Sequence, residues 1–185
     1  ESGITGSRVK AIAVNYEGNI LSGWEGGISV CNVEEKQTYL GSVNITSGET
    51  NAVFVIWNDG RGDGDDIFGQ MIDINGNLLG SSDGIPIAYY DSYQQNPSIV
   101  YNEELNEILI CWDDYIQGSY YDISCRSIHI DNIVLNDIFK VADIISTNQI
   151  NSNVFSTKDG NYLVVWQDSR NFSGTVAPND DIYIQ

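Results

Sequence analysis

The chain has 185 residues, with 26 acidic against 8 basic side chains and a formal net charge of −18. Such a surface repels phosphate groups, which argues against nucleic acid and anionic membrane partners. Hydrophobic residues make up 42% of the chain, enough for one folded domain with an apolar core. No apolar run is long enough to span a bilayer, so we expect no membrane insertion.

Four tryptophans mark an internal repeat. Each ends a short apolar run that is typical of a β-strand: NILSGW with Trp24, NAVFVIW with Trp57, EILICWDD with Trp112 and NYLVVWQD with Trp166. Because tryptophan is the rarest residue type, its confinement to one motif position indicates a repeat protein. We expect the tryptophans to pack between repeat units.

Each unit is predicted to contain up to four short antiparallel strands. A first strand and a turn precede the tryptophan in IAVNYEGNILSGW, SIVYNEELNEILICW and NVFSTKDGNYLVVW. A third strand follows in ISVCNV, IFGQMIDI, ISCRSIHI and IYIQ, and a fourth in TYLGSVNI, NLLGSSDGIPIA and IVLNDIFKVA. The period-two alternation and the absence of a helical period predict an all-β protein.

These units suggest one domain over residues 1–185, divided at approximately 9–42, 43–95, 96–147 and 148–185, with the last unit incomplete. The tryptophan spacing of roughly 33 to 55 residues matches the blades of a β-propeller. A β-sandwich also uses many short strands and is the competing architecture. The regular recurrence of one unit favours the propeller.

The pattern W-x-D-x-R, a variable loop and D-I-[YF]-x-Q resembles the blades of secreted or surface-attached bacterial and archaeal β-propellers, with some likeness to TolB-type blades. The resemblance covers most of the chain. It implies a propeller in an extracellular or cell-surface setting, with a binding or scaffolding role and an open choice of ligand. Such relatives usually carry more than four blades, so either the first eight residues (roughly) close a small ring or the chain is part of a larger propeller.

In three units a long loop follows the tryptophan and is flanked by two aspartates. The pairs are Asp59 with Asp66, Asp114 with Asp122, and Asp168 with Asp181. The first unit has almost no loop and lacks both aspartates, so we expect the pair to stabilise the loop, by accepting backbone N–H bonds or by sharing a cation. Arg61 and Arg170 suit a bidentate contact with one of these carboxylates.

Calcium is the sharper alternative for the loop after Trp57. This Gly-rich loop carries four closely spaced carboxylates, from Asp59, Asp63, Asp65 and Asp66. Carboxylate oxygens on a flexible backbone are the ligands that calcium prefers, although the spacing is not that of an EF-hand. Calcium is therefore the one cofactor that the sequence predicts.

Tyrosines gather in two predicted loops and are the candidate ligand contacts. Tyr89, Tyr90 and Tyr93 lie in AYYDSYQQN, and Tyr115, Tyr120 and Tyr121 lie in the loop after Trp112. Exposed tyrosines beside Asn and Asp suit contact with carbohydrate or protein. The alternative is that they cover neighbouring blades.

Catalysis has little support in the sequence. His129 is the single histidine, and no nucleophile–base arrangement can be recognised around it. Asp113, Asp114 or Glu25 would suit a glycosidase, but paired carboxylates occur by chance in so acidic a chain. Cys111 and Cys125 lie on successive predicted strands, where either a disulfide or two buried thiols is expected.

Together these patterns predict a binding or structural module at the cell surface or outside the cell, not an enzyme. Its expected partner is a protein or a glycan, contacted by the loops after Trp57, Trp112 and Trp166. Self-assembly, as a subunit of a surface layer, is a further expectation. The alternative is a catalytic or non-catalytic part of a carbohydrate-active enzyme.

Overall fold

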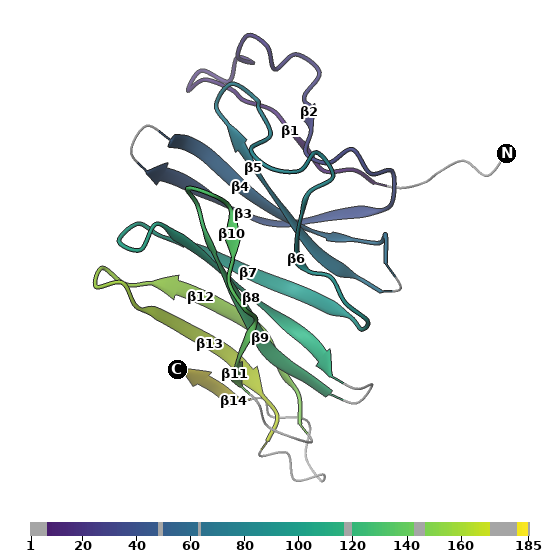
Figure 1. The fold of residues 1–185 in the computed structure, drawn as a ribbon, viewed down its shortest axis with the longest axis vertical. Helices are drawn as coiled ribbons and strands as arrows, with labels where there is room; N and C mark the ends of the chain where they lie inside the picture. Colours follow the sequence, from purple (N-terminus) through teal and green to yellow (C-terminus); the bar gives the residue numbers. More distant parts are fainter. Residues whose placement is uncertain are drawn as a thin grey trace, which may run out of the picture.

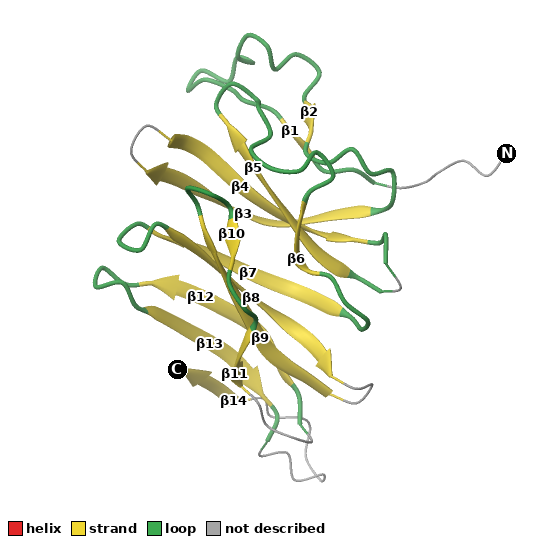
Figure 2. Ribbon diagram, viewed as in Figure 1, coloured by secondary structure: helices red, strands yellow, loops and turns green. Residues whose placement is uncertain are grey.

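The computed structural model describes residues 7–47, 50–62, 64–116, 120–142, 147–170 and 181–184. All regular structure in these ranges is β-strand, arranged in four antiparallel sheets (Figures 1 and 2). The all-β prediction is therefore confirmed. None of the described residues belongs to a helix that is able to cross a membrane.

The second sheet is a meander that holds Trp57 in its second strand. Its strands are β3 (Gln37–Ser47), β4 (Thr50–Asp59), β5 (Asp66–Asp73) and β6 (Ile85–Ala88). β3 crosses the boundary expected near residue 42 and pairs with β4 from end to end. The segment TYLGSVNI therefore opens the second sheet, and its assignment as the last strand of the first unit was wrong. The pairing of β3 with β4 continues as far as Ser47 and Thr50.

The third and fourth sheets repeat this meander. The third contains β7 (Gln94–Asn102), β8 (Glu107–Ile116), β9 (Tyr120–His129), β10 (Val134–Leu135) and β11 (Phe139–Ala142), the last two both paired with β9. The described part of the fourth contains β12 (Gln149–Ser156), β13 (Tyr162–Asp168) and β14 (Asp181–Ile184). Outer strands were thus predicted correctly in NLLGSSDGIPIA and IVLNDIFKVA, and β14 is the third strand expected in the last unit.

The first unit differs from the other three. It contains a short ladder between β1 (Lys10–Ala11) and β2 (Ile28–Ser29) and an isolated bridge between Val14 and Ile20. Trp24 lies in consecutive turns, so the strand predicted in NILSGW was wrong. The cause is the glycines that flank it, since Gly23 and Gly26 adopt φ of 89° and 85°, outside the extended region. Residues 1–6, most of the segment considered for ring closure, lie outside the described residues.

An apolar layer fills the space between each pair of neighbouring sheets. β4 contributes to two layers, because Phe54 and Ile56 face the third sheet while Val55 and Trp57 face the first unit. Trp112 packs toward the second sheet and Trp166 toward the third. These three tryptophans thus each seal a blade against the blade before it, which is the packing role expected from the repeat.

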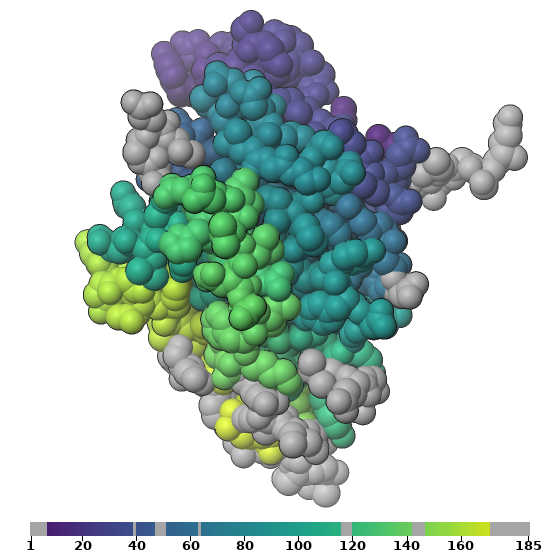
Figure 3. Space-filling model, in the orientation of Figure 1, coloured from purple at the N-terminus to yellow at the C-terminus, as the bar shows by residue number. Residues whose placement is uncertain are grey.

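The sheets follow one another in chain order down the longest axis of the molecule, as the colour sequence in Figure 3 shows. Their first strands lie side by side, β3 against β7 and β7 against β12. Antiparallel meanders packed face to face, with first strands adjacent, are typical of the blades of a β-propeller-type fold.

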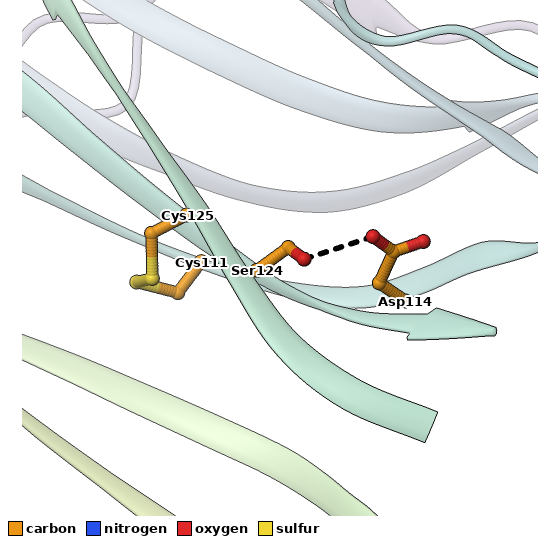
Figure 4. The surroundings of a disulfide bond; sticks show 4 residues. All are labelled: Cys111, Asp114, Ser124 and Cys125. Carbon is orange, nitrogen blue, oxygen red and sulfur yellow. Dashed lines mark hydrogen bonds between the residues drawn. A yellow bond between two sulfur atoms is a disulfide. The ribbon is translucent and has the colours of Figure 1, made fainter. Parts of the chain in front are cut away.

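Two of the three cysteines form a disulfide, and the third is a free thiol. Cys111 in β8 lies directly opposite Cys125 in β9, and the two form a disulfide (Figure 4). Cys31 is a free thiol and is fully buried. Of the two alternatives left open by the sequence, the structure therefore has the disulfide.

Candidate functional site

A polar row crosses the loop end of each of the three larger sheets. In every row a glutamine from the first strand lies opposite the first aspartate, which lies opposite the second aspartate. The rows are Gln37–Asp59–Asp66, Gln94–Asp114–Asp122 and Gln149–Asp168–Asp181. Because like charges directly opposite one another destabilise a sheet, each row requires a compensating group.

The three glutamines escaped the sequence analysis. Each is at most 1% exposed, and its side-chain amide donates a hydrogen bond to a carbonyl of the preceding connection: Gln37 to Val33, Gln94 to Tyr90 and Gln149 to Thr147. The available signal was positional, since each glutamine precedes its aspartate by about 20 residues. The glutamines therefore fix the entry of the chain into each blade.

Asp59 of the second sheet is neutralised by Arg61. The guanidinium donates from Nε to Asp59 Oδ1 at 2.8 Å and from Nη2 to Oδ2 at 2.7 Å, and the Arg61 backbone N–H donates to Oδ1. Trp57 Nε1 donates to Oδ2 at 2.9 Å. Although burial acts to raise it, these bonds hold the pKa of Asp59 below its ordinary value. Both expected roles of Asp59, loop clamp and arginine partner, are present.

The fourth sheet repeats this arrangement with Trp166, Asp168 and Arg170. Arg170 donates from its backbone N–H to Asp168 Oδ1, and its guanidinium reaches Oδ2 at 2.6 Å. Trp166 Nε1 donates to the same oxygen at 3.3 Å. The unit W-x-D-x-R is thus a local motif that closes the start of the loop.

The third sheet, which has no arginine at this position, uses Tyr90 instead. Trp112 Nε1 donates to the Tyr90 hydroxyl at 3.3 Å, and that hydroxyl donates to Asp114 Oδ2 at 2.8 Å. Ser124 Oγ also donates to Asp114 Oδ2 at 2.8 Å, as Figure 4 shows. Burial raises the pKa of Asp114 above its ordinary value, against the opposing effect of these two hydrogen bonds.

The second aspartates of the rows differ in their partners. Asp122 forms an ion pair with Lys140 of β11, with 3.0 Å between Nζ and Oδ2. Asp66 is 2% exposed, and its Oδ2 has no hydrogen-bond partner among the described residues. Burial first, and then the charge of Asp59, raise the pKa of Asp66 to about 6. Asp66 is therefore the least compensated carboxylate of the rows in the described part of the chain.

A cleft of about 320 Å³ opens beside Asp66. It is lined by Arg61, Gly62, Asp66, Tyr89, Tyr90 and Asp91. The connection from β6 to β7 forms one wall. It is held between the loop after Trp57 and the end of β8, because Gln94 N donates to Asp65 O and Tyr115 N donates to Tyr93 O. The cleft therefore lies at the end of the second sheet that carries its polar row, beside the connection that leads into the third sheet.

The six predicted tyrosines divide into contact and support positions. Tyr89, Tyr93 and Tyr120 are exposed, at 55%, 49% and 41% respectively. Tyr115 lies between Tyr93 and Tyr121, with ring centroids 6.3 Å and 4.9 Å apart. The hydroxyl of Tyr90 is engaged inside the fold by Trp112 and Asp114. The two sequence clusters are thus joined into one surface through Tyr93 and Tyr115.

The four predicted calcium ligands do not share one environment. Asp59 is bound by Arg61, Asp65 is exposed and Asp66 is buried, while Asp63 lies outside the described residues. Among the residues that the structure describes, no three acidic, cysteine or histidine side chains gather as a metal site would require. Calcium stays a prediction, because the loop is described without its central aspartate.

The carboxylates considered for glycosidase chemistry have structural partners. Asp113 is fully buried, accepts hydrogen bonds from Asn96 Nδ2 and the Asn151 backbone, and so joins the third and fourth sheets. Burial raises the pKa of Asp113 to about 6, against those hydrogen bonds. Glu25 accepts from the Gly23 backbone in the turns of the first unit. Neither residue lines the cleft.

Comparison with known proteins identifies the fold and leaves the family open. No protein-family profile matches the sequence, and no curated protein matches it. Among solved structures, an alpha-L-arabinofuranosidase from Lactobacillus brevis is similar, with a TM-score of 0.50 and 11% identity over 86% of this chain and 55% of that one. A thermostable family-43 glycoside hydrolase has a TM-score of 0.49 and 13% identity, over 85% of this chain and 57% of that one.

This chain thus spans little more than half the length of either protein. At 11% identity the likeness to the arabinofuranosidase concerns the fold alone. It confirms the propeller-type fold expected from the repeat.

Proposed function

We propose that this chain is an extracellular or cell-surface propeller module that binds a glycan in the cleft beside Tyr89. The supporting observation is the cleft itself, which combines an exposed aromatic ring with a guanidinium and two carboxylates on the loop face of the blades. A tyrosine ring packs against the apolar face of a sugar, while carboxylates and guanidinium exchange hydrogen bonds with its hydroxyl groups. The structural likeness to a protein described as an arabinofuranosidase supports carbohydrate as the ligand class.

The test is binding to a glycan array, followed by calorimetry with the best oligosaccharide. Tyr89→Ala should weaken that binding about five- to tenfold, because one stacked aromatic ring contributes on the order of 1 to 1.5 kcal/mol. Tyr16→Ala is the matched control, since Tyr16 is 97% exposed and lies in the first unit, away from the cleft. If no glycan on the array binds, or if Tyr89→Ala and Tyr16→Ala weaken binding equally, the proposal is wrong.

A carbohydrate-active enzyme is the second candidate, because two carboxylates, Asp66 and Asp91, line the same cleft. Most glycosidases act through a pair of carboxyl groups, one with a raised pKa. The pKa of about 6 that burial gives Asp66 would suit the acid. Turnover of chromogenic glycosides that disappears in Asp66→Asn and in Asp91→Asn would favour the hydrolase, whereas binding without turnover favours the module.

We further propose that the loop after Trp57 binds calcium and that the chain self-assembles. Calcium at the loop after Trp57 predicts a higher melting temperature on adding calcium chloride, and this rise should vanish in Asp65→Asn. Self-assembly predicts that the sedimentation coefficient increases with protein concentration. Each measurement is independent of the glycan experiment.

A further inference from the structure

The second and third sheets place different residues at one equivalent position of their outer strands. In the third sheet Lys140 lies opposite Ser124, two residues beyond Asp122, and its ammonium compensates that aspartate. In the second sheet Pro86 lies opposite Phe68, two residues beyond Asp66. The cationic side chain that completes the third row is therefore replaced by a proline in the second.

The cleft reaches Asp66, the residue that lacks such a cation. Asp66 lines the cleft although it is only 2% exposed, so it forms part of the floor. Its Oδ2 is a buried acceptor with no hydrogen-bond partner in the described part of the chain. A Cβ on Gly62 would lie 2.2 Å from that oxygen, so glycine alone leaves room for the carboxylate at this point of the loop.

We propose that the cleft recognises a primary ammonium group on its glycan, that of a de-N-acetylated amino sugar, which pairs with Asp66 as Lys140 pairs with Asp122. This inference rests on the glycan-binding function proposed above and narrows its ligand class. The ammonium group of the ligand compensates Asp66 in the second polar row, as the ammonium of Lys140 compensates Asp122 in the third.

The other groups around the cleft favour a cation. Arg61, the one positive side chain in the lining, is bound to Asp59 through both Nε and Nη2 and stacks on Phe68, 3.8 Å from the ring centroid. Asp91 adds a second carboxylate, and Tyr89 offers an exposed aromatic face, which attracts ammonium groups. The chain's charge of −18 raises the local concentration of cationic ligands.

Desolvation explains why Asp66 gains from such a ligand. A buried carboxylate is costly unless it is fully paired. Burial raises the pKa of Asp66 to about 6, although the Tyr90 backbone N–H donates a hydrogen bond to it. The charged groups around it are Asp59, Asp65 and Arg61, of which the two aspartates oppose its ionisation. An ammonium group at hydrogen-bond distance reverses this balance, because an opposite charge favours the ionised form.

The experiment compares oligomers of glucosamine with the same oligomers of N-acetylglucosamine, titrated into the whole chain at pH 7 by calorimetry. At this pH most of Asp66 is ionised, and an ionised carboxylate beside the sugar amine favours its protonated form. We expect the amino form to bind at least tenfold more tightly. Asp66→Asn should remove this preference, whereas Asp83→Asn, an exposed aspartate of the preceding connection, should keep it.

A second variant supplies the missing cation from the chain itself. Pro86→Lys places an ammonium at the position of Lys140, so it should abolish the preference for the amino form and raise the melting temperature. Thermal melts of every variant show whether it is folded, which separates a lost contact from a lost fold.

The outcomes distinguish the two proposals. Equal binding of acetylated and de-acetylated oligomers overturns the ammonium inference and leaves glycan binding in place. If neither oligomer binds and no glycan on the array binds, both the ammonium inference and the glycan-binding function are overturned. An Asp66-dependent response to calcium chloride alone, without one to glucosamine, also overturns the inference, because the compensating cation is then a metal.

Discussion

The second and third sheets compensate the same row of facing aspartates with different groups. Both place a glutamine and two aspartates in a row across three strands. The third sheet compensates its row with groups from elsewhere in the fold, Tyr90, Ser124 and Lys140. The second relies on the neighbouring Arg61 for Asp59 and leaves Asp66 facing a cleft. The difference teaches that a repeated motif can be fully compensated in one blade and leave a carboxylate beside a cleft in the next.

The largest expected effect on stability comes from removing Arg61, the cation that compensates Asp59 in the second sheet. Arg61→Met should lower the free energy of unfolding by about 3 to 5 kcal/mol, because it leaves the fully buried Asp59 without its counter-charge. Chemical denaturation measures the loss. Arg8→Met is the control, since the Arg8–Glu34 pair is exposed and should contribute less than about 1 kcal/mol. Equal effects in the two variants would contradict the compensating role of Arg61.

Reduction of the disulfide tests the third sheet by itself. Cys111 and Cys125 are separated by 14 positions, so their disulfide closes a loop of that length. Reducing this disulfide should lower the free energy of unfolding by about 3 kcal/mol. The melting temperature with and without a reductant measures this effect. Cys31→Ser, which cannot alter a disulfide, should leave the reductant-dependent difference unchanged. If the melting temperature is the same with and without the reductant, the disulfide does not stabilise the fold.

Tyr90→Phe breaks the hydroxyl link that replaces arginine in the third sheet. Trp112 Nε1 and Asp114 each lose a partner, which should cost about 2 kcal/mol in unfolding free energy. Tyr89→Phe removes a hydroxyl from the exposed neighbour and should change stability little. If the two variants melt alike, Tyr90 is not a structural counterpart of Arg61.

The smallest effect concerns Asp66 and has a defined dependence on pH. Its pKa in the folded state, about 6, lies above the ordinary 3.8, so the folded state holds the proton more tightly than the unfolded state. The ionised carboxylate therefore lowers stability above pH 6, and this penalty disappears as the pH falls from 6 toward 3.8. Asp66→Asn should stabilise the protein by about 1 to 2 kcal/mol at pH 8 and by almost nothing at pH 3.5.

Urea unfolding of wild type and Asp66→Asn at several pH values measures this difference. Asp83→Asn, at an exposed position, should give a small difference that does not vary over the same range. A stabilisation by Asp66→Asn that grows on acidification would contradict the assignment of Asp66 as an uncompensated group.

Much of the fold was predictable because the repeat is local in sequence. Trp57, Trp112 and Trp166 each lie in a run whose alternation predicts a strand, and W-x-D-x-R closes over five residues. Trp24 was mispredicted because an apolar run with flanking glycines is compatible with a strand or with turns. Only the positive φ values of those glycines decide between the two.

The candidate site was predictable only in part, for a reason of distance. The sequence located the tyrosines and the aspartate pairs, which lie in or beside single loops. It missed the pairing of Asp122 with Lys140 and of Asp114 with Tyr90, because these partners are 18 and 24 residues apart and come from different strands or connections. Compensation of a buried charge depends on such tertiary contacts, so a carboxylate without a compensating cation cannot be recognised from the motif.

The alternation of side chains along β4 and β8 has a consequence for how the molecule opens. Each of these strands supplies side chains to the apolar layers on both of its faces. Detaching one blade therefore strips apolar cover from its neighbour, which couples the opening of adjacent blades. Amide hydrogens of β4 and β8 should be the slowest to exchange with deuterium, and the short ladder between β1 and β2 should be the first to exchange.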